Sequence, residues 1–359
     1  MTKVFYPEKV FVEQTAAQLP RTKRILDRVG EAEIISVADH RKIDFSGGPH
    51  SDRFARAKKH LAVTVKKGGL VKEFRRHSCL RQGREYYLVH AAGCPFDCSY
   101  CYLQSYFENP VPTIFVNTDE LFEQVESALE SESDGEVLFH AGETADALAL
   151  EHLSGFAAEA VEFFSKLPGA LLELRTKSAG VETILPLSHA GRTVVAWTLT
   201  PRAVAERYER GAALLEARLE ATARCARAGY PVGLRLDPLI HYDGWREGYR
   251  GLMEEISAAL DAASIHSIVL GAFRFPPPLR EIILERHGRN ELALGEFIPS
   301  PDGKMRYFRH IREEMYRELV GLIRESFGEG CVNRIELAME PEFIWESVGL
   351  SGPTRRQPV

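Results

Sequence analysis

The chain has 359 residues, and at about 150 residues per domain this length predicts two domains or one large α/β barrel with extensions. Hydrophobic residues make up 45% of the chain and charged residues 27%, which is typical of a globular protein and excludes a disordered, collagen-like or disulfide-rich chain. The formal net charge of -6 excludes a uniformly basic protein that coats nucleic acid.

Cysteine usage and the N-terminal residues indicate the compartment. Three of the six cysteines, Cys94, Cys98 and Cys101, are crowded together, which in a reducing compartment indicates metal ligation. The first ten residues, MTKVFYPEKV, lack the apolar run of a secretory signal, and no stretch approaches the roughly 18 uncharged apolar residues that span a bilayer. We therefore expect a cytoplasmic protein with no membrane partner.

Residues 1–85 show no clear repeat of strand and helix, and we treat them as an N-terminal extension. Within it, the interval from Arg53 to Arg76 contains nine Lys and Arg residues and one acidic residue, Glu73. This basic segment has two interpretations: it is a solvated surface, or it is a patch that contacts the phosphates of a DNA substrate.

From residue 86 onward, strand-like and helix-like segments alternate. Apolar strand patterns are followed by amphipathic helices at about 119–131, 146–164, 214–228 and 245–260. The expected strands are 86–91, 113–117, 136–141, 170–176, 193–199, 232–239 and 267–273. This alternation predicts an α/β fold with a partial (β/α)6-type barrel over residues 86–278, followed by a mostly helical C-terminal region, 279–359.

The segment AAGCPFDCSYCYLQ carries the chemistry. Cys94, Cys98 and Cys101 form a C-x3-C-x2-C pattern directly after the first barrel strand, where parallel α/β folds place their active sites. Three thiolates can ligate three irons of a [4Fe-4S] cluster and leave the fourth iron open for a substrate or cofactor. A structural zinc site is the alternative, with His90 or His140 as the fourth ligand.

The cysteine pattern resembles the signature of radical S-adenosylmethionine (SAM) enzymes, whose fold is a full or partial (β/α) barrel. The resemblance implies a [4Fe-4S] cluster and SAM as cofactors. In this superfamily, SAM chelates the open iron and an electron from the cluster cleaves it to methionine and a 5′-deoxyadenosyl radical, which abstracts a hydrogen atom. It also implies a reductant such as flavodoxin or ferredoxin.

Within that superfamily, the chain resembles spore photoproduct lyases, the DNA repair enzymes that revert a methylene-bridged thymine dimer to two thymines. The resemblance covers most of residues 86–290 and weakens on both sides. It rests on CSYCYLQ, FVNTDELFEQV, LRTKSAGVETIL and RLEATARCARAGYPVGLRLDPLIHYDGWREGY, which follow in the same order. The implied function is a lyase-type radical SAM enzyme acting on a thymine dimer in DNA. The alternative is an enzyme of the same lineage acting on a non-DNA substrate.

The resemblance implies roles for individual residues. Cys94, Cys98 and Cys101 would ligate the cluster. Lys177 resembles a lysine that contacts the SAM carboxylate, and Thr198 corresponds to a serine at the same site. Tyr100 and Tyr102 match a tyrosine pair that assists radical transfer back to SAM, and we predict them as catalytic residues.

The sequence departs from this family at Glu143. The family has a cysteine there that donates hydrogen to the product radical, and a carboxylate has no weak X–H bond to give. Gly142 and Glu143 instead resemble a GGE-like motif that binds the SAM amino group, whereas a third interpretation makes Thr144 a helix cap and leaves Glu143 exposed. Substitute thiols could come from the other cysteines, which are Cys79, Cys225 and Cys331.

Other charged residues lie near predicted strand ends. Arg235 and Asp237 are candidates for a phosphate or carboxylate contact and a SAM ribose contact, and an internal ion pair explains them equally well. Arg274 is a candidate substrate-phosphate contact. Residues 303–312 form a second basic cluster, which is also consistent with an ordinary helix face.

Overall fold

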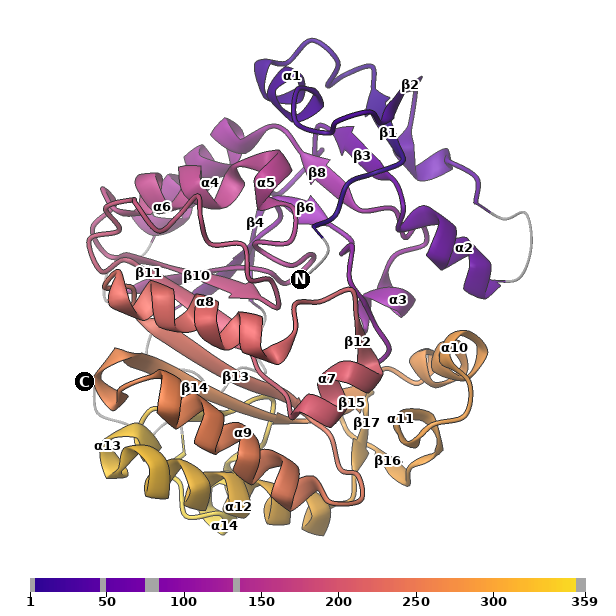
Figure 1. The fold of residues 1–359 in the computed structure, drawn as a ribbon. Helices are drawn as coiled ribbons and strands as arrows, with labels where there is room; N and C mark the ends of the chain where they lie inside the picture. The colour runs from indigo at the N-terminus through magenta and orange to yellow at the C-terminus, as the bar shows by residue number, and fades with distance from the viewer. Residues whose placement is uncertain (1–3, 46–49, 75–83, 132–135, 353–359) are drawn as a thin grey trace.

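The computed structural model describes residues 4–45, 50–74, 84–131 and 136–352, and its strands form two main sheets (Figure 1). The smaller sheet lies at the top of Figure 1 and contains five strands in the order β2-β1-β3-β8-β6. Its strands are β1 (Lys9–Glu13), β2 (Glu33–Val37), β3 (Leu61–Thr64), β6 (Ala91–Ala92) and β8 (Thr113–Phe115). All neighbours pair in parallel except β6 and β8, which are antiparallel.

The larger sheet is the expected partial barrel. Six parallel strands follow one another in space in chain order, from β5 to β14, and β18 adds a seventh parallel strand at one edge. These strands are β5 (Glu85–Leu88), β9 (Val137–Ala141), β10 (Ala170–Thr176), β11 (Thr193–Thr198), β13 (Val232–Leu239), β14 (Ile265–Ala272) and β18 (Ile335–Leu337). The short strand β4 (Val71–Glu73) closes the other edge in antiparallel orientation.

Helices cover the outer face of the barrel, as Figure 1 shows for α4, α6, α8 and α9. Their apolar stripes match the helical period, which is why these segments pack against the sheet. The covering helices are α4 (Thr118–Glu130), α6 (Phe156–Phe164), α8 (Leu215–Arg227), α9 (Trp245–Ala259), α12 (Arg309–Phe327), α13 (Glu329–Val332) and α14 (Glu342–Ser347). Helix α5 (Glu151–Ser154) instead packs Leu153 into the core of the smaller sheet. None of the helices formed by the described residues is both long and apolar enough to span a membrane.

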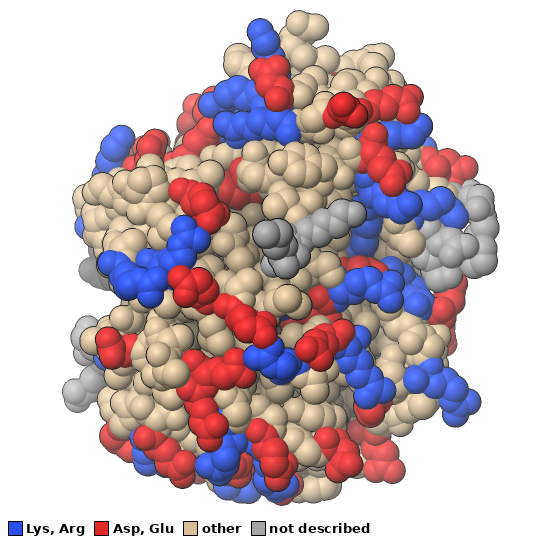
Figure 2. Space-filling view, viewed as in Figure 1, with Lys and Arg blue, Asp and Glu red and all other residues tan. Residues whose placement is uncertain are grey.

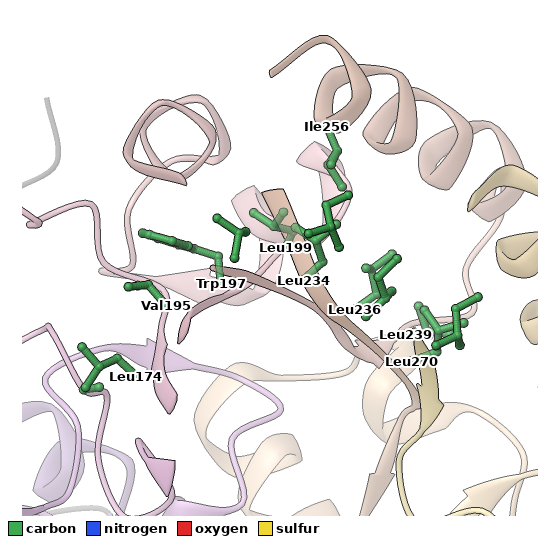
Figure 3. Close-up of a cluster of buried hydrophobic side chains, with 14 of the residues drawn as sticks. Leu174, Val195, Trp197, Leu199, Leu234, Leu236, Leu239, Ile256 and Leu270 are labelled. Atoms are coloured by element: carbon green, nitrogen blue, oxygen red, sulfur yellow. The ribbon is translucent and has the colours of Figure 1, made fainter. Parts of the chain in front are cut away.

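The core between sheet and helices is built from consecutive barrel strands. Figure 3 shows Leu174, Trp197 and Leu234, from β10, β11 and β13, in one cluster with Ile256 of α9. All four side chains are fully buried or nearly so. Gly233 permits close strand packing, since a Cβ there would lie 2.7 Å from the Cβ of Ala196 on β11.

The remaining elements are short strands, helices and 3-10 turns. Two-residue strands β7 (Asp97–Cys98) and β12 (Glu209–Arg210) pair with each other, and β15 (Arg274–Phe275), β16 (Phe297–Pro299) and β17 (Met305–Tyr307) form a small antiparallel sheet. The other helices are α1 (Pro20–Leu26), α2 (His50–Ala57), α3 (Leu103–Tyr106), α7 (Arg202–Tyr208), α10 (Pro278–His287), α11 (Glu291–Leu294) and the 3-10 turns η1 (His40–Lys42) and η2 (Ala262–Ser264).

Three expectations about elements are wrong. Residues 1–85 do contain a strand and helix repeat, which forms most of the smaller sheet. The strand expected at 113–117 joins β3 in that sheet and does not enter the barrel. The helix expected at 146–164 begins only at Glu151 and is interrupted at Gly155, because the Asp146 carboxylate accepts hydrogen bonds from Leu148 and Ala149 and Gly155 is left-handed, with φ +67°.

Candidate active site

A cavity of about 580 Å³ lies where the barrel strands end. Its volume falls in the range of roughly 300–1,000 Å³ that is typical of small-molecule sites. Loops following β5, β9, β10 and β18 contribute to its wall. The structure brings together all nine predicted site residues in this wall, which are Cys94, Cys98, Tyr100, Cys101, Tyr102, Gly142, Glu143, Lys177 and Thr198.

The three cysteines come from one loop between β5 and α3. Cys98 is buried, Cys94 and Cys101 are partly buried, and all three are free thiols. Burial raises the pKa of Cys94 to about 12 and also raises that of Cys98, so both are protonated thiols at neutral pH until a metal displaces their protons. Three thiols on one loop, facing one cavity, are a donor set that fits three irons of a cubane cluster.

Neither histidine of the zinc alternative joins these thiols. His90 is buried and stacks on Phe156, with ring centroids 4.1 Å apart. His140 lies between two carboxylates, with its Nδ1 2.7 Å from Glu173 and its Nε2 3.1 Å from Glu85. Neither ring lines the cavity, so the fourth ligand that a structural zinc site needs does not come from them.

The loop after β9 presents Glu143 to the cavity. The Tyr102 hydroxyl donates hydrogen bonds to the Glu143 backbone oxygen at 2.5 Å and to its Oε1 at 3.1 Å, and Arg175 lies 3.4 Å from Oε2. The Thr144 hydroxyl donates to the Ala91 carbonyl at 2.6 Å, and the nearest helix begins seven residues later. The interpretation of Thr144 as a helix cap is therefore wrong, and Glu143 is held toward the site.

Lys177 follows β10 and is placed by Asp146. The Asp146 carboxylate accepts a hydrogen bond from the Lys177 backbone N–H at 2.7 Å and another from the Thr176 hydroxyl at 2.7 Å. Burial alone would lower the pKa of Lys177, but nearby Cys98, when ionised, and the Glu209 carboxylate raise it, so the ammonium stays charged. Its Nζ lies 5.4 Å from the centroid of the Tyr100 ring.

Tyr100 and Tyr102 have different surroundings. Tyr100 is buried, and its hydroxyl donates to Glu209, which also forms a 2.5 Å ion pair with Arg218. Tyr102 has 39% of its surface exposed. Burial raises the pKa of Tyr100 well above the ordinary value, and Glu209 adds to the shift. The pKa of Tyr102 is also raised, by desolvation of its hydroxyl and by the adjacent Glu143 carboxylate. Both tyrosines therefore keep their hydroxyl hydrogen at any physiological pH.

Charged residues line the inner face of the barrel. Glu173 accepts a hydrogen bond from Arg175 and lies 3.4 Å from Arg235, while Asp237 forms a two-pronged pair with Arg274 at 2.9 and 3.2 Å. Arg235 and Asp237 thus pair with other residues of the barrel. Arg274, a candidate phosphate contact, is already paired with a carboxylate.

Sequence reasoning missed Asp146 and Arg175 as cavity residues. A signal for Arg175 was present, because Glu173 and Arg175 alternate with Leu172 and Leu174, and Lys177 continues the same period of two, so the three share one face of β10 and its extension. Asp146 had no comparable signal, since its place depends on the path of a loop.

The second basic cluster is neither a plain helix face nor one patch. Arg306 is buried and bonds to Asp302 at 2.6 Å, and Arg312 is buried against Glu340. Arg309 pairs with Glu313 on the surface, and Lys304 lines the cavity beside Met339. Figure 2 shows Lys and Arg interspersed with Asp and Glu over the face viewed.

The basic segment is also divided among different surroundings. Lys59 is exposed and pairs with Glu8 at 3.4 Å, whereas Lys58 turns inward toward the cysteine loop. Arg75 and Arg76, and the candidate thiol Cys79, lie outside the described residues. Cys225 and Cys331 are buried in α8 and α13, and neither lines the cavity.

Three cysteines on the loop after the first strand of a partial parallel barrel define a radical SAM enzyme. The chain belongs to the spore photoproduct lyase family, whose family model matches residues 5–320. The spore photoproduct lyase of Bacillus subtilis is 28% identical over 302 residues, covering 82% of this chain and 86% of the relative. That of Clostridium acetobutylicum is 24% identical over 291 residues, covering 80% and 84%.

A solved structure agrees with this assignment. A spore photoproduct lyase complexed with a dinucleoside spore photoproduct matches with a TM-score of 0.83 and 25% identity, covering 91% of this chain and 98% of that one. The partial barrel predicted from the sequence is therefore confirmed, and so is the lyase-like radical SAM class.

The backbone at Gly142 offers a test of how the Glu143 loop is held. Its φ is +118°, and a Cβ there would lie 2.7 Å from the Arg175 carbonyl oxygen and 2.8 Å from the Arg175 Cβ. We expect Gly142→Ala to lower the free energy of unfolding by about 1–3 kcal/mol, because both the backbone strain and the clash oppose it. Denaturant unfolding measures the change.

The matched control is Gly191→Ala. Gly191 also has a positive φ, +72°, but nothing lies within 4 Å of a Cβ built there. The control therefore carries the strain without the clash, and equal losses in the two variants would contradict the close packing of Gly142 on Arg175.

Proposed function

We propose that this protein is a SAM-dependent lyase that repairs the methylene-bridged thymine dimer of DNA. The observation that carries the proposal is the convergence of the cysteine loop, the Gly142–Glu143 loop, Lys177 and the two tyrosines on one cavity in a chain of this family. The relative solved with a dinucleoside spore photoproduct supports a substrate of that kind.

The cavity fits the two cofactors. Cys94, Cys98 and Cys101 would ligate a [4Fe-4S] cluster, and Gly142, Glu143, Lys177 and Thr198 would hold SAM. When bound, the cluster and SAM supply a one-electron cleavage that yields methionine and a 5′-deoxyadenosyl radical able to abstract hydrogen.

In this proposal, the residues of the chain bind and orient SAM. The Lys177 ammonium offers a charged partner to the SAM carboxylate, and the Glu143 carboxylate offers one to its amino group. Arg175 and Tyr102 hold Glu143 in place. Burial of the loop and the apolar part of the cavity wall, which includes Phe273 and Val269, limits water near the reacting atoms.

A second candidate function is supported by specific residues. By the resemblance to the family, Glu143 matches the position of the hydrogen-donor cysteine, and a carboxylate cannot return a hydrogen atom to a carbon radical. The inner face of the barrel also carries Glu173, Arg175 and Arg235, which favour a polar substrate. These features support a radical SAM enzyme of this lineage that acts on a non-DNA substrate.

Two further expectations stay predictions. A one-electron donor such as flavodoxin or ferredoxin is required by the proposed chemistry. A cytoplasmic location is consistent with free cysteines at Cys94, Cys98 and Cys101.

Replacement of Cys98 tests the cluster ligation. We expect Cys98→Ala to lose cluster binding and SAM cleavage, because two thiols cannot fix the cubane. Iron and sulfide content and 5′-deoxyadenosine formation would be measured under anaerobic conditions. Cys225→Ala, a buried cysteine of α8, is the control and should keep both properties. Full SAM cleavage by Cys98→Ala would rule out the ligation.

Glu143→Gln tests the SAM contact. A hydrogen bond to a charged group contributes about 1.5–3 kcal/mol, so loss of the carboxylate should weaken SAM binding by roughly 10-fold or more. Isothermal titration of the reconstituted protein measures the Kd, and Glu126→Gln on the exposed face of α4 is the control. An unchanged Kd would assign Glu143 to the substrate instead.

The repair activity is tested directly with a dinucleoside spore photoproduct, SAM and a reductant in the absence of oxygen. We expect repaired dithymidine together with 5′-deoxyadenosine, both followed by mass spectrometry, and undamaged dithymidine is the control substrate. SAM cleavage without repaired product would contradict repair and favour the second candidate.

A further inference from the structure

Lys58 connects the smaller sheet to the cysteine loop. It directly follows α2, and its Nζ donates hydrogen bonds to the carbonyl oxygen of Cys94, at 3.1 Å, and to that of Phe96. The same ammonium lies 3.5 Å from the Asp97 carboxylate, and its side chain is only 14% exposed. A residue of the basic segment thus points into the loop that carries the three cysteines.

Arg286 of α10 also forms hydrogen bonds with the cysteine loop. Its guanidinium donates to Asp97 at 2.8 Å and to the Gln104 side-chain oxygen, and its side chain is 3% exposed. The guanidinium also lies 4.5 Å from the ring centroid of Phe54 on α2. The elements α2 and α10 therefore meet at Asp97.

Gln104 extends these contacts to the cysteines. Its Nε2 donates to the carbonyl oxygens of Cys98, Ser99 and Cys101, at 3.2, 3.0 and 3.2 Å. The loop itself has little regular structure, since β7 is two residues long and, among the strands that the structure describes, pairs with β12 alone. Backbone carbonyls of the loop thus accept hydrogen bonds from the side chains of Lys58 and Gln104. In a longer sheet, backbone N–H groups of a neighbouring strand would donate these bonds.

We propose that Lys58 and Arg286 are positioning residues that fix the cysteine loop through Asp97 and Gln104 before the cluster is bound. These four residues form a loop clamp. The inference rests on the proposed ligation by Cys94, Cys98 and Cys101. Removing one member leaves a buried charge or carbonyl without its partner, so the loop loosens and the spacing of the three sulfur atoms is no longer held.

The test compares Lys58→Met with Lys59→Met. Lys59 is the adjacent, exposed lysine, and its variant removes the same charge without touching the loop. In the protein without cluster, hydrogen exchange of the Ser99 and Cys101 amides should be about 10-fold faster in Lys58→Met, because these amides report opening of the loop. After reconstitution, a chelator should remove iron about 10-fold faster from Lys58→Met than from the wild-type chain. The conservative variant Lys58→Arg should lose iron as slowly as the wild type.

A second variant keeps the proposal testable if Lys58→Met folds poorly, which circular dichroism would reveal. Asp97→Asn removes the group that both cations share. If the clamp acts as a unit, the Ser99 and Cys101 amides of the double variant, Lys58→Met with Asp97→Asn, exchange no faster than those of the more affected single variant. The clamp is overturned if Lys58→Met and Asp97→Asn exchange amides and lose iron at the same rates as Lys59→Met. It is also overturned if the effects of the two substitutions add in the double variant. A wild-type chain that binds no iron would instead overturn the ligation, while the exchange measurement still decides whether the loop is clamped.

Discussion

The carboxylate of Asp146 holds the two halves of the site together. It accepts hydrogen bonds from the backbone of Lys177, Leu148 and Ala149 and from the Thr176 hydroxyl, so the loop after β9 is fixed to the end of β10. Glu143 lies on the first of these segments and Lys177 on the second. Asp146 thereby places a carboxylate and an ammonium around one cavity, and these are the two groups that the proposed function assigns to the amino and carboxylate ends of SAM.

The cavity is polar because charged side chains of the barrel strands form part of its wall. Charges there pair across the barrel: Arg235 on β13 pairs with Glu173 on β10, two strands away in the sheet, and Asp237 on β13 pairs with Arg274 on β15. Burying such ions is costly, and well-packed apolar residues are often at least as stabilising. Ion pairs at the strand ends, beside an apolar core that includes Leu174 and Trp197, therefore fit a site for a polar bound group better than a device for stability.

The partial barrel and the grouping of the cavity residues could be predicted from the sequence, but the path of each segment could not. Cysteine spacing and position after a strand singled out the three thiols, whereas Lys177 and Thr198 came from the resemblance to the family. All five line one cavity, because carboxyl ends of parallel strands meet at one edge. Side-chain direction could not be obtained this way. Lys58 and Lys59 are neighbours with the same chemistry, yet one is bonded to the cysteine loop and the other to Glu8.

Sheet membership was equally hidden in the local pattern. The segment around Thr113–Phe115 is as β-branched and apolar as a barrel strand, and periodicity cannot say which sheet it enters. Likewise, the helical pattern of 146–164 gives no sign that a capping carboxylate and a left-handed glycine divide it. Tertiary contacts decided both outcomes.

The course of the chain between the two sheets makes them interdependent. It enters the larger sheet at β4 and β5, returns to the smaller sheet for β6 and β8, and re-enters the larger sheet at β9. A protein shortened to begin at residue 86 would keep β8 but lose β3, its parallel neighbour. The orphaned edge would offer unpaired amides and carbonyls to other molecules, so aggregation, and not a smaller active enzyme, is the expected product of that truncation.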